Sequence, residues 1–166
     1  MLLALHSDAS YLSEPEAKSR AAGHFFLGKL NDEDFDNGAI MPLSKIIKHV
    51  MTSASEAETV ALFYNCKAAA PLRITLEEMG HPQPKTQVTT DNSTDQGPFS
   101  KSMIPKAAKS YGMRFNLKCR QAQRQFDFVW RRGNEKRGDY HSKRHPVKHY
   151  VAKRHNYVVD MPLHNQ

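Results

Sequence analysis

The feature that most constrains the fold is a change in the spacing of apolar residues near residue 53. Before that point the spacing is typical of β-strands, in three segments at residues 1–8, 20–29 and within 39–51. From residue 54 to 79 the apolar residues recur every three or four positions, which predicts one amphipathic helix. The apolar face of such a helix has to be buried, and a neighbouring sheet is the surface that this pattern offers.

Several residues are suited to begin, end or interrupt these segments. Ser53 or Ser55 is suited to cap the start of the helix, and Gly80 is suited to end it. Pro71 lies inside the helical pattern, where a missing N–H group and ring clashes predict a kink or a split into two helices. Pro42 is expected to interrupt the third strand.

After the long helix, strand-like and helix-like segments alternate. We expect a strand, a helix, a strand and a short helix, in the ranges 85–90, 106–123, 125–131 and 134–143. Three strands followed by this alternation predict an α/β fold, in which a mixed sheet carries packed helices.

Length and composition describe an ordinary globular domain. The 166 residues suit a single domain, and 39% of them are hydrophobic and 25% charged. The apolar runs are far shorter than the ~20 residues that cross a bilayer, and we expect no membrane segment and no secretory signal. Cys66 and Cys119 fit neither a zinc site nor a disulfide framework, so we expect an intracellular protein, cytoplasmic or nuclear.

The charge is unevenly distributed along the chain. Residues 1–100 contain eight basic and 13 acidic residues, a net charge of −5, whereas residues 101–166 contain 16 and four, a net charge of +12. Such asymmetry indicates a polyanionic partner, or else a solvated basic surface or disordered tail. We expect a folded domain over residues 1–144 and a basic, loosely ordered C-terminal extension over 145–166.

Acidic residues lie at four informative places in this pattern. Asp8 ends the first predicted strand and Asp91 directly follows the strand predicted over 85–90, and small polar residues come after each acid. The helix start offers Glu56 and Glu58, which are about 200° apart around the axis, so only one of them easily faces the sheet. Asp139 follows the last strand. Each acid alone has an ordinary interpretation as a loop cap or surface residue, but together they suggest a shared site.

Clustered carboxylates of this kind have a recognised chemistry. Hard oxygen ligands suit Mg²⁺ or Mn²⁺. Two such ions about 4 Å apart clamp a phosphodiester, one activating the attacking water and the other stabilising the leaving oxygen.

The order and surroundings of these acids resemble the ribonuclease H domain at the end of a copia-type LTR retrotransposon polyprotein. The segments that carry the resemblance are Ser7-Asp8-Ala9-Ser10, Ser19–Leu27, Ser53-Ala54-Ser55-Glu56-Ala57-Glu58, Leu76–Gly80, Thr90-Asp91-Asn92-Ser93, Met113-Arg114-Phe115, Trp130-Arg131 with Gly133, and Gly138-Asp139-Tyr140 with Ser142-Lys143. They cover about residues 5–145, and their joint order is more specific than any one motif.

The resemblance implies a ribonuclease H-like α/β fold: a five-stranded mixed sheet with helices packed on both faces. It implies an RNA–DNA hybrid ribonuclease, a phosphodiester hydrolase that uses two Mg²⁺ or Mn²⁺ ions. The implied catalytic metal ligands are Asp8, Glu58, Asp91 and Asp139. The implied partners are the RNA–DNA hybrid and a reverse transcriptase domain of the same polyprotein.

Some neighbours of the acids are candidate nucleic-acid ligands. Asn92 and Ser93 are placed to sense 2′-hydroxyl groups, or they form a turn or a helix cap. Lys143 and Arg144 are suited to follow a phosphate backbone, or they begin an unstructured remnant.

The chain also departs from the family pattern. Arg137-Gly138 and His141 stand where the family has Leu-Ala and Phe. This departure leaves a second function open, that of a catalytically inactive, ribonuclease H-like nucleic-acid-binding remnant. Another member of the same superfamily, such as an integrase or an exonuclease, fits the order of the acids less well.

Overall fold

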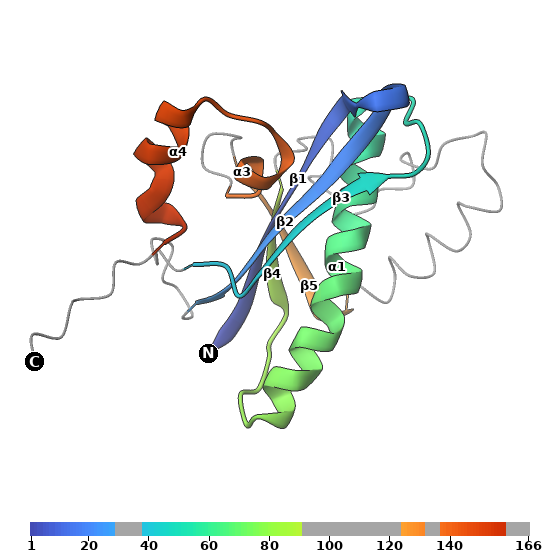
Figure 1. Cartoon of the computed structure of the whole chain (residues 1–166). Helices are drawn as coiled ribbons and strands as arrows, with labels where there is room; N and C mark the ends of the chain where they lie inside the picture. The colour runs from blue at the N-terminus through green and yellow to red at the C-terminus, as the bar shows by residue number, and fades with distance from the viewer. Residues whose placement is uncertain (29–37, 91–123, 132–136, 159–166) are drawn as a thin grey trace, which may run out of the picture.

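The computed structural model describes residues 1–28, 38–90, 124–131 and 137–158 (Figure 1). Its centre is a five-stranded sheet in the order β3-β2-β1-β4-β5. The strands are β1 (Leu2–Glu14), β2 (Lys18–Gly28), β3 (Met41–Ile47), β4 (Thr86–Thr90) and β5 (Phe126–Trp130). β1, β2 and β3 pair antiparallel, whereas β4 pairs parallel with both β1 and β5. The sheet is therefore mixed, as predicted.

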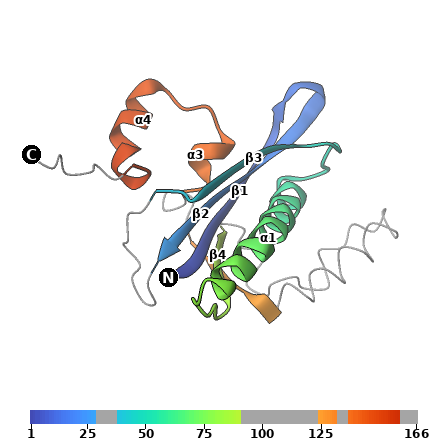
Figure 2. The same ribbon diagram turned by 60° about the horizontal axis from the view of Figure 1, so that its bottom comes forward.

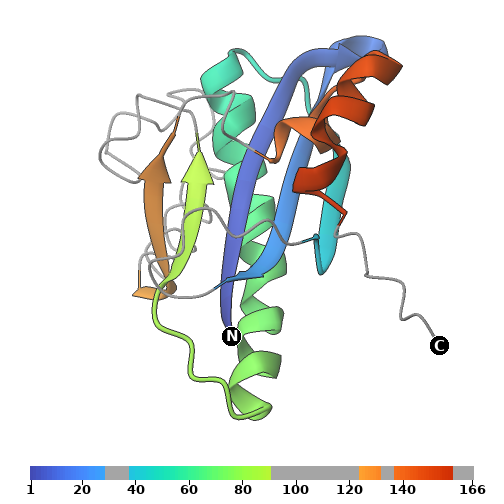
Figure 3. The same cartoon turned by 90° about the vertical axis from the view of Figure 1, so that its left-hand side faces the viewer.

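Helices cover both faces of this sheet. They are α1 (Ala54–Glu78), α3 (Asp139–Ser142) and α4 (Val147–Lys153), with single 3₁₀ turns η1 (Pro15–Ala17) and η5 (Arg154–Asn156). Figure 2 shows α1 along one face and α3 and α4 on the opposite side of the strands, and Figure 3 shows the same layers from the side. The α/β architecture with helices on both faces is confirmed.

Alternation along β1 assigns its side chains to the two faces. Leu3 and Leu5 are buried in the core beneath α1, whereas Asp8 contacts α3 on the other face. The core beneath α1 consists of two clusters, one with Leu3, Leu5, Phe25, Leu62, Cys66, Ala69, Leu76, Val88 and Phe126, the other with Ala9, Ala21, Ile47, Met51, Ala57, Val60 and Ala61. The second cluster lies at the end of α1 that carries the candidate acids.

α1 begins and ends where the sequence predicts. Ser53 Oγ accepts a hydrogen bond from the Glu56 N–H at 3.1 Å, and Gly80 adopts a φ of +84°, which favours glycine. The helix is not split at Pro71, contrary to one of the two outcomes expected there. Burial of one long face against the sheet stabilises the helix across the proline, because tertiary packing outweighs local propensity.

Two further expectations about the strands are wrong. β1 does not end at Asp8 but runs on to Glu14, because β2 continues to pair with it beyond that acid. Pro42 does not interrupt β3, because β3 is an edge strand, where proline removes no ladder hydrogen bond that a central strand would need.

The end of the described chain folds back onto the sheet. The expected loosely ordered segment from His145 contains α4, and the Tyr157 ring lies 5.3 Å from that of His24 and 4.1 Å from that of Tyr140. The domain boundary after residue 144 stays a prediction. The helix predicted over 106–123 lies outside the described residues. None of the described helices is long and apolar enough to cross a membrane.

Pro71 provides a test of how α1 is stabilised. The Pro71→Ala variant restores a backbone donor inside the helix at an exposed position, so we expect the free energy of unfolding to rise, by up to about 3 kcal/mol. Urea denaturation followed by circular dichroism measures this change. An unchanged or lower midpoint would show that the helix has adapted its geometry to the proline.

Candidate active site

Asp8 is the most buried of the candidate acids that the structure describes. It lies within β1 with only 1% of its surface exposed, and its Oδ2 accepts a short hydrogen bond from Ser142 Oγ of α3. A buried carboxylate requires such partners, because desolvation of its charge is otherwise costly. Its side chain therefore lies between the sheet and α3.

The backbone of β1 beside Asp8 is reached from α1 as well. β4 pairs with β1 only from Ala4 to His6, opposite Gln87 to Thr89. Beyond His6 the ladder with β4 stops, and the Ala9 N–H donates to Glu58 Oε1 at 3.1 Å. Glu58, from the second turn of α1, is thus anchored next to Asp8 at the edge that β4 leaves uncovered.

The two glutamates at the start of α1 have different roles. Glu56 Oε2 accepts hydrogen bonds from the N–H and the hydroxyl of Thr52, at 2.6 and 2.7 Å, and so helps to cap the helix. Glu58 instead reaches β1. The structure therefore brings Glu58 to the sheet, and Glu56 stays at the helix start.

Asp139 begins α3, and Gly138 explains how close α3 comes to β1. A Cβ atom added at Gly138 would lie 3.0 Å from Asp8 Cβ and 3.1 Å from the carbonyl oxygen of His6. These distances are shorter than ordinary van der Waals contacts, and one of them involves the backbone. Glycine at this departure from the family pattern thus allows the start of α3 to pack directly against Asp8.

The Asp139 side chain, 27% exposed, already has two basic neighbours. It forms a short ion pair with Lys143 one turn later, and Nε2 of His145 lies 3.5 Å from its Oδ2. Lys143 was predicted to follow a nucleic-acid backbone; in this structure its ammonium group contacts Asp139 instead. Any cation that bound Asp139 would compete with these neighbours.

The sequence did not predict a cluster of aromatic and histidine side chains that packs around α3 and holds it against the sheet. His24 is fully buried on β2, and its Nδ1 lies 3.3 Å from His141 Nε2, with the two rings stacked 5.5 Å apart. Tyr157 packs edge-on against His24 and donates a hydrogen bond to the Arg137 carbonyl at 3.0 Å. Burial lowers the pKa of His141 and raises the pKa of the Tyr157 phenol, so both are neutral near pH 7.

The residues of this cluster that lie on the strands could be read in the sequence, but their role was ambiguous. His6 and His24 pair across β1 and β2, and Phe26 completes the same face. Histidines on strands carry no pattern that distinguishes a packing role from a ligand role. At position 141 histidine does what an aromatic residue would do, because it stacks on His24.

The remaining predicted site residues divide into two groups. Asp91, Asn92 and Ser93 lie outside the described residues. Arg144 is exposed and follows α3. Within the described ranges no three histidine, cysteine or acidic side chains come close enough together to hold a metal ion. Asp8 of β1 and Glu58 of α1, which reaches the amide of Ala9, nonetheless carry the carboxylate oxygens that Mg²⁺ or Mn²⁺ prefers.

The chain matches no protein-family model and no curated protein. Among solved structures it is similar to ribonuclease H1 from the halophilic archaeon Halobacterium salinarum, with a TM-score of 0.56 and 14% identity over 86% of this chain and 95% of that one. It is similar to the N-terminal ribonuclease H domain of Rv2228c from Mycobacterium tuberculosis, solved as a fusion with maltose-binding protein (TM-score 0.53, 12% identity, 84% and 87% covered).

A third similar structure is LC11 ribonuclease H1, which was solved in complex with an RNA/DNA hybrid (TM-score 0.55, 13% identity, 84% and 92% covered). All three identities are low, so the likeness concerns the arrangement of the backbone and not particular side chains. The five-stranded mixed sheet with its helices is the ribonuclease H fold.

Proposed function

We propose that this protein is a divalent-metal-dependent endonuclease that hydrolyses the RNA strand of RNA–DNA hybrids. The observation that carries the proposal is that Glu58 of α1 reaches the backbone of Ala9, the residue after Asp8, at the edge of β1 where the pairing with β4 stops. Sites in open α/β sheets lie outside the carboxyl ends of strands. The ribonuclease H fold provides the context in which these two acids have a catalytic meaning.

The strand register supports Asp91 as the third acid. Thr89 pairs with His6 in parallel register, and Thr90 is the last described residue of β4. Ser7 follows His6 as Thr90 follows Thr89, so the described part of β4 ends level with Ser7, one residue before Asp8. We propose that Asp91 joins Asp8 and Glu58, and that Asp139 completes the set from α3.

These four carboxylates would hold two Mg²⁺ or Mn²⁺ ions. Such ions supply an activated water and stabilise the leaving oxygen of a phosphodiester. The protein supplies position: Ser142 fixes Asp8 by a hydrogen bond, and the Ala9 N–H fixes Glu58. Fixed ligands matter because a displacement of about 1 Å costs as much as about 100-fold in rate.

Residues beside the acids are proposed to hold the hybrid. Asn92 and Ser93 would contact 2′-hydroxyl groups of the RNA strand in its minor groove. Lys143 and Arg144 would contact phosphates, with Lys143 released from Asp139 when a metal ion takes its place.

We further propose that the domain derives from a copia-type LTR retrotransposon polyprotein, where it would work beside a reverse transcriptase domain inside the cell. The support is the order of the sequence motifs from Ser7-Asp8 to Ser142-Lys143.

A second candidate is an inactive protein that binds hybrids or RNA. The ion pair of Lys143 with Asp139 favours it, because this ammonium group neutralises a carboxylate that an active enzyme would offer to a metal ion, and His145 lies against the same carboxylate. The two candidates make opposite predictions for cleavage and the same prediction for binding.

Cleavage of a labelled RNA–DNA hybrid in Mg²⁺ or Mn²⁺ tests the assignment. We expect the wild type to cut the RNA strand and EDTA to abolish the activity. Asp8→Asn, Glu58→Gln and Asp91→Asn each remove a ligand and should lower the rate by at least about 100-fold. Glu78→Gln, an exposed acid near the other end of α1, is the matched control and should cleave normally.

Circular dichroism of the same variants separates loss of activity from loss of the fold. Normal cleavage by all three site variants would refute the nuclease assignment. Binding without cleavage by the wild type would favour the inactive binder.

Gly138→Ala tests whether the close approach of α3 to β1 positions Asp139. The added methyl group meets Asp8 and the backbone of His6, so we expect α3 to shift by a few tenths of an ångström and cleavage to fall by about tenfold. Gly28→Ala, whose Cβ would meet nothing within 4 Å, is the matched control. Equal cleavage rates for the two alanine variants would show that this contact has no part in positioning Asp139.

A further inference from the structure

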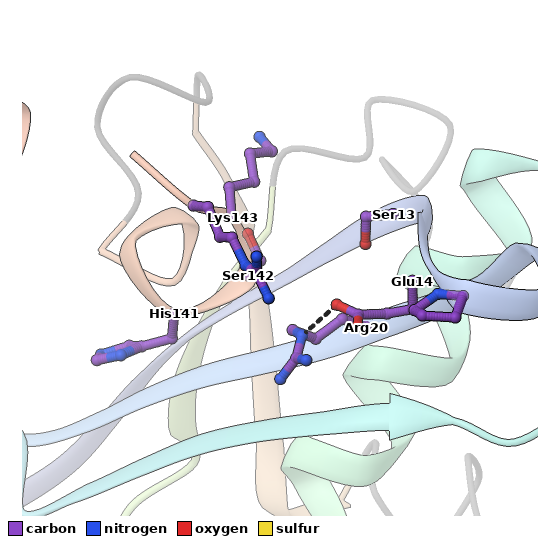
Figure 4. Close-up of a pocket in the computed structure, with 8 residues that line it drawn as sticks. Ser13, Glu14, Arg20, His141, Ser142 and Lys143 are labelled. Atoms are coloured by element: carbon purple, nitrogen blue, oxygen red, sulfur yellow. Dashed lines mark hydrogen bonds and ion pairs between the residues drawn. The ribbon is translucent and has the colours of Figure 1, made fainter. Parts of the chain in front are cut away.

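A cavity of about 590 Å³ lies between the connection of β1 to β2 and the end of α3 (Figure 4). Its walls include Ser13 and Arg20 on one side and Ser142, Lys143 and Arg144 on the other. Two of these residues also touch the candidate active site, because Ser142 contacts Asp8 and Lys143 contacts Asp139. The cavity and the carboxylates therefore share a wall.

The charge of the cavity walls favours an anion. Arg20, Lys143 and Arg144 are basic, and Glu14 is the single acid among the lining residues. Glu14 is paired, since its Oε1 accepts a hydrogen bond from Arg20 Nε at 2.6 Å, and this bond holds the pKa of Glu14 below its usual range. His141 also lines the cavity, and its burial keeps it uncharged near pH 7.

Arg20 is held in place with donor capacity to spare. Its Nε is bound to Glu14, and its Nη1 donates to Ser44 Oγ at 3.0 Å. Its Nη2 donates to none of the residues that the structure describes. A guanidinium group fixed in this way is suited to phosphate oxygens, because little side-chain entropy remains to be lost on binding. Arg144 is exposed and adds a further positive charge to the cavity wall, where Glu14 is the one acid.

The segment from Leu12 to Ala17, which ends β1 and leads into β2, holds the other wall in an unusual shape. Leu12, Glu16 and Ala17 have positive φ angles of 50°, 58° and 53°. Such conformations cost about 1 to 2 kcal/mol each for residues other than glycine. Hydrogen bonds from the Leu12 N–H to Ser19 Oγ and between the Ser10 and Ser13 hydroxyls keep the connection in this form. Ser13 is thereby held at the cavity.

We propose that this cavity is a phosphate subsite that holds a backbone phosphodiester of the hybrid, next to the one bound at the carboxylates. Arg144 and Nη2 of Arg20 are the donors. Phosphates recur about every 3.4 Å of helix axis along each strand, so a strand that crosses the carboxylates also presents phosphates to the adjoining wall. The inference rests on the proposed binding of a hybrid, but it does not require cleavage.

Metal-free binding of a fluorescent RNA–DNA hybrid, measured by anisotropy over a range of salt concentrations, tests the subsite. Arg144→Gln removes one phosphate contact, so binding should weaken about fivefold in about 0.15 M salt and the slope of log K against log salt should shrink by about 0.9. Glu14→Gln removes the one repulsive charge and should tighten binding. Lys67→Gln, an exposed lysine on α1 across the sheet, is the matched control and should leave both quantities unchanged.

Inorganic phosphate is the second probe, followed through the amide NMR signals of Ser13 and Ser142. Saturable shifts in these signals, lost in Arg144→Gln, are expected alongside hybrid binding. Wild-type affinity and salt slope in both cavity variants would overturn the subsite. Phosphate shifts without hybrid binding would also overturn it, since the cavity would then take free phosphate only. Hybrid binding with the expected variant effects but no cleavage would refute the nuclease and leave the subsite standing.

Discussion

The early end of the pairing between β1 and β4 is the constraint on which the candidate site depends. β1 runs to Glu14 beside β2, whereas its ladder with β4 stops at His6. Backbone groups of β1 beyond His6 on that side need other partners, since unpaired buried amides are costly. Glu58 satisfies the amide of Ala9, and this places one acid of the helix next to an acid of the strand. The gap in the ladder thus creates the site.

The position of α3 is determined by its contacts with the opposite face of the same strands. α3 is only four residues long and has little stability of its own, so its position depends on packing. Gly138 permits its close contact with β1, and stacking of His141 on His24 fixes its far side. Tyr157 closes the cluster from the end of the described chain. A segment that looks like a basic tail in the sequence therefore supports the element that carries Asp139.

Much of the fold could be predicted from the sequence, because periodicity reports which residues face a core. The long helix with its Ser53 cap and its end at Gly80 followed from local rules. The end of β1 did not, because pairing with β2 decides it and local composition does not. Tolerance of Pro42 depends in the same way on β3 being an edge strand, which is a property of the whole sheet.

The site shows the same division between local and tertiary information. Helix geometry could predict that only one of Glu56 and Glu58 reaches the sheet, since residues two positions apart point in different directions. The choice of Glu58 came from the resemblance to the family. The role of Gly138 could not, because the atoms that a side chain would meet belong to β1, more than a hundred residues away. The place of Arg20 could not be predicted either, because only in the folded chain does it line the same cavity as the residues at the end of α3.

The placement of charge ties these observations together. Carboxylates such as Asp8 and Asp139 repel the phosphodiester that they are proposed to act on, so a strand needs attraction from nearby. The basic second half of the sequence provides this attraction close to the acids. Lys143 and Arg144 come directly after α3, which begins at Asp139, and both line the adjoining cavity. Because the basic residues are so close, Lys143 pairs with Asp139 in this structure and occupies a carboxylate that would otherwise be open to a metal ion. A bound cation at the acids would release Lys143 toward the phosphates, so metal binding and strand binding would reinforce each other.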